Sequence, residues 1–154
     1  MSGESDNLNA NSAAVLAYLG ALQDTIKRLA GNSGQCKAWC ITITAAIVVL
    51  SARTATPNHA WIGIIPIIMF CYLDAYYLSL ERIFVETYKG AANRVRNRTI
   101  ALNDLFVFPA PRLDPVKDKL KRLASALAST SVTPFYVLLL LTLAFVRVAV
   151  LTSS

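Results

Sequence analysis

Three long apolar runs dominate the hydrophobic pattern of this 154-residue chain. They occupy residues 38–56, 60–80 and 132–151, and each contains a single formally charged residue. Each run has about the ~20 residues that an α-helix needs to cross roughly 30 Å of hydrocarbon. Because the runs are apolar on every side and the rest of the chain is too short to cover them, a soluble bundle fits them poorly. The pattern predicts three transmembrane helices.

Two other segments show an apolar stripe with helical spacing. The stripe within residues 12–30 is formed by Val15, Leu19, Leu22, Ile26 and Leu29. It predicts an amphipathic helix that packs either on a copy of itself or on the chain's own cytoplasmic helix. The stripe between Pro115 and Thr130 is formed by Val116, Leu120, Leu123 and Leu127. Because this second segment is also basic and precedes an apolar run, we expect it to lie on lipid headgroups.

These elements predict an all-α integral membrane protein with three transmembrane helices and amphipathic cytoplasmic helices. The stretch "GNSG" at 31–34 predicts a turn before the first span, and the second span is expected to continue as one helix through residue 98. The predicted regions are a disordered tail at 1–11, an N-terminal amphipathic helix and turn at 12–37, a transmembrane hairpin at 38–80, a basic cytoplasmic helical segment at 81–131, and a third span with a short external C-terminus at 132–154.

The distribution of Lys and Arg predicts the orientation. Three of the 15 precede the first run and ten lie between the second and third runs. Because cytoplasmic loops carry the excess of basic residues, the N-terminus and the 81–131 segment are expected in the cytoplasm. We therefore expect a multi-pass protein of the cell inner membrane with an external C-terminus.

One carboxylate, Asp74, lies inside the second run, about 20 Å below its outer end by residue count. A charge at that depth requires a partner or a polar path. We expect a partner among nearby hydroxyls or in a copy of Asp74 on another subunit, either as a structural acid inside one protomer or as a ring lining a path. Arg147 lies too close to the outer boundary to serve. The candidate intramembrane polar residues are Asp74, Tyr72, Tyr76, Tyr77, Thr42 and Thr44.

A helix hinge is expected in the second run at Gly63 and Pro66, because proline interrupts helical hydrogen bonding. On the cytoplasmic side, basic side chains are candidates for contact with anionic lipid or with a trigger, either a protein or a nucleotide. These are Lys89, Arg94, Arg96, Arg98, Lys117, Lys119, Lys121 and Arg122. Nucleic acid is not expected as a partner, because no glycine-rich phosphate loop or nucleic-acid-binding module is recognisable.

Catalytic chemistry is not indicated. The chain has one histidine, His59, and shows no paired carboxylates, no nucleophile with a base and no metal-ligand cluster. Cys36 and Cys40 are four residues apart, a spacing that alone indicates neither a metal site nor a disulfide. We therefore expect neither an enzyme nor a cofactor.

The layout resembles that of small bacterial antiphage membrane effectors of the SLATT-like group. The stripe from Val15 to Leu29, the hairpin from residue 38 to 80 and the stretch "YYLSLERIFVETY" carry this resemblance, and the third span departs from it. It implies a homo-oligomer that perturbs or permeabilises the bilayer when its basic cytoplasmic segment is triggered. A non-conducting membrane anchor or scaffold that binds a partner protein or anionic lipid remains an alternative, as does a holin-like lysis protein.

Overall fold

The computed structural model describes residues 12–54, 61–110 and 115–152. It contains α1 (Ala13–Thr54), α2 (Ile64–Arg96), a short 3-10 helix η2 (Leu102–Asp104), α3 (Val116–Leu127) and α4 (Thr133–Thr152). These ranges contain no strand, which confirms the predicted all-α fold. The predicted tail at 1–11 and His59 in the predicted external turn lie outside the described residues.

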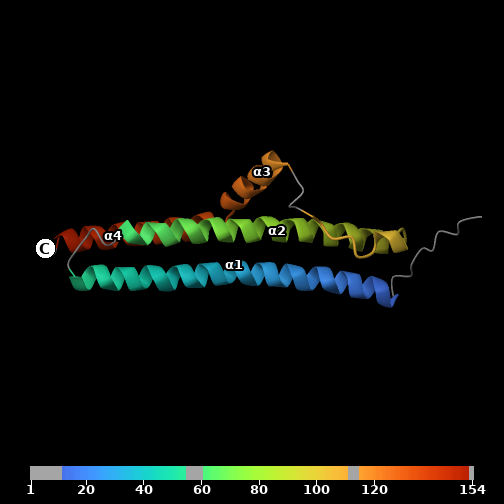
Figure 1. Cartoon of the computed structure of the whole chain (residues 1–154), viewed down its shortest axis with the longest axis horizontal. Helices are drawn as coiled ribbons and strands as arrows, with labels where there is room; N and C mark the ends of the chain where they lie inside the picture. Colours follow the sequence, from blue (N-terminus) through green and yellow to red (C-terminus); the bar gives the residue numbers. More distant parts are fainter. Residues whose placement is uncertain (1–11, 55–60, 111–114, 153–154) are drawn as a thin grey trace, which may run out of the picture.

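Helices α1 and α2 run antiparallel and lie side by side along most of their length (Figure 1). The 42 residues of α1 extend about 63 Å at ~1.5 Å per residue, twice the thickness of a bilayer's hydrocarbon. The turn predicted at 31–34 was wrong, because α1 continues through it without a break. Gly31 and Gly34 do not adopt a positive φ, and packing against α2 outweighs their low helix propensity.

One end of the hairpin has its own core, made by Val15, Tyr18, Leu22, Ala91, Ile100 and Leu105. The chain after α2 folds back over this end, and the Tyr18 hydroxyl donates a hydrogen bond to the carbonyl oxygen of Val107 at 3.0 Å. The N-terminal stripe therefore packs on the chain's own α2, which confirms one of the two partners predicted for it. We call this end, α1 up to residue 32 with α2 from residue 80 and the chain to residue 110, the cytoplasmic half, after the location that the sequence predicts for it.

The other end of the hairpin forms a three-helix bundle with α4, which lies alongside it (Figure 1). Its core consists of Cys40, Ile67, Val132, Tyr136 and Leu143. Helices α1 and α2 are long and apolar enough to cross a membrane, whereas α4 offers a shorter apolar stretch, Thr133–Ala149. We call this end, α1 from residue 33, residues 61–79 and α4, the apolar half.

Helix α3 projects from the side of α2 (Figure 1). It ends at Leu127, before the predicted boundary at Thr130. Its C-terminal part is held by Arg82, whose Nη1 donates to the carbonyl oxygen and the Oγ of Ser125, each at 3.2 Å. Ala126 is fully buried, but Val116 and Leu120 at the other end are 78% and 64% exposed. The predicted stripe of α3 is thus only partly covered by the protein.

Candidate functional site

A buried polar cluster joins α1 to α2. The Asp74 side chain on α2 is fully buried, and its Oδ2 lies 2.6 Å from the Nζ of Lys37 on α1. The Ser33 hydroxyl donates a hydrogen bond to the other carboxylate oxygen, Oδ1. Lys37 Nζ also donates to Ser33 Oγ at 3.3 Å. The three side chains, which we call the polar cluster, therefore contact one another in every pair.

Helical spacing explains why α1 supplies two of the three groups. Ser33 and Lys37 are four residues apart, so both side chains lie on one face of α1. Cys36 and Cys40 are buried along the same side of α1, and the interface with α2 therefore runs through this face. The break predicted at 31–34 would have removed this arrangement, since Ser33 can face Asp74 only as part of a continuous helix.

The two charges are unequally exposed. The Lys37 side chain retains 21% of its accessible surface, whereas Asp74 retains none. Lys37 therefore approaches the interface from its edge and directs its ammonium group inward to the carboxylate. Two charges withdrawn from water gain little net stability from each other, but removing one leaves the other uncompensated at a cost of about 3–5 kcal/mol.

The polar cluster lies at the boundary between the two halves. From Ser33 to Thr54, α1 extends about 31 Å at ~1.5 Å per residue, close to one hydrocarbon thickness. The depth predicted for Asp74 was counted from residue 60, but α1 continues beyond the start of α2 (Figure 1). Asp74 is level with Ser33, where the apolar half begins on α1, and it lies five residues before the end of that half at residue 79 on α2.

The partners predicted for Asp74 within the protomer were wrong. Tyr72 and Tyr76 are 53% and 39% exposed on the outside of α2. The ring of Tyr77 packs against Tyr76 with centroids 5.9 Å apart. Thr42 donates its hydroxyl to the carbonyl oxygen of Ala38, and Thr44 is buried without a hydrogen bond from its Oγ1. The exclusion of Arg147 was correct, because its guanidinium lies over the Trp61 ring at 4.9 Å.

The hinge predicted at Gly63 and Pro66 takes another form. Because α2 begins at Ile64, directly after a 3-10 turn at residues 61–63, Pro66 lies in the first turn of the α-helix, a position that proline favours. No proline kink is therefore required. Gly63 instead permits close packing, because a Cβ there would lie 3.0 Å from Cδ1 of Leu143.

The candidate basic residues do not form one site. Arg94 pairs with Asp104 at 2.8 Å and so ties α2 to η2. Lys119 and Arg122 line a cleft between α2 and α3 together with Tyr72 and Tyr76. The structure thus brings two of the predicted intramembrane polar residues together with two of the basic residues predicted to contact anionic lipid or a trigger. The remaining candidates are exposed at separate positions, namely Lys89, Arg96, Arg98, Lys117 and Lys121.

The chemistry of the polar cluster is electrostatic. The Ser33 proton is directed at the carboxylate, and the ammonium of Lys37 neutralises the same group. The cluster thus has the geometry of a hydrogen-bonded ion pair, in which one carboxylate receives both the Ser33 proton and the Lys37 charge. The described residues also contain no group of three or more His, Cys, Asp or Glu side chains suited to a metal ion. The arrangement is suited to holding two helices together at a defined register.

Sequence reasoning missed Ser33 and Lys37. Lys37 was counted as a boundary charge for orientation, and Ser33 was assigned to the turn. The available signal was the spacing of Ser33 and Lys37, which are one helical turn apart just before the run at 38–56. In an antiparallel hairpin, this end of the first run lies beside the later part of the run at 60–80, which contains Asp74. Comparisons with protein-family models, curated proteins and solved structures find no match to this chain.

Proposed function

We propose that this chain is an effector of the bacterial inner membrane that assembles as a homo-oligomer and perturbs the bilayer when its cytoplasmic half receives a trigger. One observation carries the proposal. Both α1 and α2 pass unbroken from one half into the other, and a buried ion pair joins them where the halves meet. A change at the cytoplasmic end can therefore reach the apolar end through two continuous helices.

The exposed surface of the apolar half supports a membrane location. Large apolar side chains cover it on all three helices, including Trp39, Ile65, Ile68, Leu138 and Phe145, each more than half exposed. Contiguous apolar surface of this kind is unfavourable in water and favourable in hydrocarbon. We include α4 as a third span, since its 20 residues cover about 30 Å.

The buried ion pair supports a switching role for this boundary. Apolar residues of similar volume usually replace a buried ion pair with no loss of stability, so a passive anchor has no need of one. Ionisable groups inside membrane proteins more often mark a functional element. Separating α1 from α2 here would expose a carboxylate and an ammonium group at the inner membrane surface, a change that water and headgroups would stabilise.

A non-conducting anchor or scaffold is the second candidate. It is favoured by the contacts of Asp74, because Lys37 and Ser33 of the same protomer already satisfy its carboxylate. No ring of subunits is needed to satisfy this acid.

Dye release from liposomes distinguishes the two candidates. The purified full chain would be reconstituted at increasing protein-to-lipid ratios, which favour assembly by mass action. We expect the wild type to release dye and the double variant Lys37→Met/Asp74→Leu, which removes the pair without leaving a lone charge, to release much less. The control Asp24→Asn/Lys27→Gln removes an exposed pair on α1 and should behave as wild type.

Release unaffected by Lys37→Met/Asp74→Leu would exclude the polar cluster from the mechanism. If the wild type released no dye at any ratio, the anchor would be the better account.

A further inference from the structure

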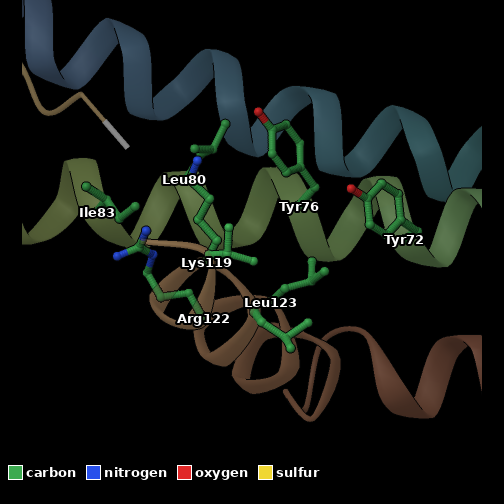
Figure 2. Close-up of a pocket in the computed structure, with 9 residues that line it drawn as sticks. Tyr72, Tyr76, Leu80, Ile83, Lys119, Arg122 and Leu123 are labelled. Atoms are coloured by element: carbon green, nitrogen blue, oxygen red, sulfur yellow. The ribbon is translucent and has the colours of Figure 1, made fainter. Parts of the chain in front are cut away.

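The cleft between α2 and α3 has the character of a ligand site. Its volume is about 300 Å³, and Tyr72, Tyr76 and Leu80 of α2 and Lys119, Arg122 and Leu123 of α3 contribute to its lining (Figure 2). The cleft exists because α3 is held to α2 through Ser125 near its C-terminal end, while its N-terminal end stands away. The apolar stripe of an amphipathic helix thus borders the space and remains exposed at Val116 and Leu120.

The two basic side chains of the cleft act from one face of α3. Lys119 and Arg122 are three residues apart, and both reach across toward α2, where they lie near Leu80 and Ile83 (Figure 2). An arginine fork and a neighbouring ammonium group match the oxygens of a phosphate. The surrounding wall is nevertheless mostly apolar, which a free phosphate ion would not require.

The cleft is also polarised along α2. Its basic end lies beside Ile83, toward the cytoplasmic half, whereas Tyr72 lies at the opposite end and Leu123 lies between them (Figure 2). Tyr72 and Tyr76 are two residues on either side of Asp74, which places them near the inner edge of the apolar half. Tyrosines are typical of this interfacial level, where the ring contacts acyl chains and the hydroxyl contacts headgroups.

The geometry points to a binding site for one anionic phospholipid of the inner leaflet. Its phosphate lies between Lys119 and Arg122, and the start of an acyl chain follows Leu123 and Tyr72 toward the hydrocarbon. This assignment rests on the membrane location in the proposed function. It goes beyond headgroup attraction to a basic surface, because it requires particular side chains on two helices.

Native mass spectrometry of the purified full chain in mild detergent tests the site, with phosphatidylglycerol and phosphatidylcholine added in turn. We expect the wild type to retain phosphatidylglycerol in preference, and Lys119→Gln/Arg122→Gln to lower that retention by roughly tenfold or more, given ~1 kcal/mol for each basic residue near anionic lipid. Lys117→Gln/Lys121→Gln is the matched control, because it removes two charges from exposed positions of α3 that do not line the cleft. Equal losses in both double variants, or no preference for phosphatidylglycerol in the wild type, would overturn the assignment.

Two further measurements identify the occupant. Leu123→Ser should reduce retention if an acyl chain contacts this wall, and unchanged retention would argue against a lipid. Millimolar inorganic phosphate should displace phosphatidylglycerol far less well than a short-chain phosphatidylglycerol, and equal displacement would indicate a phosphate site instead.

Membrane fractionation separates this assignment from the proposed function. A chain that partitions into the aqueous fraction would refute the proposed function, whereas an integral protein without lipid selectivity would refute only this site.

Discussion

The ion pair between Lys37 and Asp74 contributes little net stability, but removing either partner alone is costly. Asp74 is fully buried, and among the described residues its carboxylate is neutralised by Lys37 of α1. We expect Lys37→Met alone to lower the free energy of unfolding by about 3–5 kcal/mol, because it leaves an uncompensated buried charge. Lys37→Met/Asp74→Leu should recover most of this loss. Thermal unfolding in detergent, followed by circular dichroism, measures the cycle. Additive losses in the double variant would show that the two residues do not interact.

The buried Tyr18 makes a hydrogen bond in the other half of the molecule, the cytoplasmic half. Burial raises the pKa of its phenol above the ordinary 10.0, and the positive charge of Arg94 opposes this in part. The hydrogen bond to Val107 also requires the protonated form, since a phenolate cannot donate. Because the unfolded chain loses the proton first, the stabilisation is complete below pH 10.0 and declines as the pH rises above it.

Tyr18→Phe tests this contact directly. Removing the hydroxyl should lower the free energy of unfolding by about 1 kcal/mol at neutral pH, because the hydrogen bond is lost while the ring contacts with Phe106 and Phe108 remain. The difference from wild type should shrink above pH 10.0. Denaturant unfolding at several pH values provides the measurement, and a difference that stayed constant with pH would contradict the role given to the proton.

At the scale of the elements, the continuity of α1 is the feature on which the polar cluster depends. Gly31 and Gly34 lie in α1 at exposed positions, and a Cβ at either would meet no atom within 4 Å. We expect Gly31→Ala and Gly34→Ala each to stabilise the protein by up to about 1 kcal/mol, because alanine favours the helix at no steric cost. Gly63→Ala is the contrasting substitution, since its Cβ would lie 3.0 Å from Leu143 and should lower stability. Melting temperatures that fell for both α1 variants would indicate that a bend at 31–34 is needed.

The elements also show what could be predicted from the sequence. Apolar runs and stripes with helical spacing were enough for the all-α fold and for the long α2, because both signals depend on local composition. Lys37 as the partner of Asp74 could not be predicted by counting residues from the turn, because α1 and α2 end at different levels. The prediction of a turn at 31–34 was wrong because the low helix propensity of glycine is only a weak signal. Tertiary packing decides whether the helix ends there.

At the scale of the whole molecule, the two halves differ in what stabilises them. The cytoplasmic half has a compact core and an ion pair, Arg94 with Asp104, that fastens the chain after α2. The apolar half directs large apolar side chains outward, and it buries Cys40, Thr44 and Ser51 beside the larger Ile67 and Leu143. An apolar outer surface combined with small and polar residues between the helices is typical of helices that pack together in lipid. The polar cluster lies where one pattern gives way to the other.

The charge distribution predicts a single orientation across the membrane, because ten of the 15 Lys and Arg residues lie between the second and third apolar runs and cytoplasmic segments carry the positive excess. In a variant whose three native cysteines are replaced by alanine, we expect Arg53→Cys at the end of α1 to react with a membrane-impermeant maleimide in intact spheroplasts. Arg98→Cys, just after α2, should react only after the membrane is permeabilised. Both positions are exposed on the protein surface and lie next to the end of a long helix. Labelling of Arg98→Cys in intact cells would place the basic segment outside, and a trigger that acts from the cytoplasm would then have no surface on which to act.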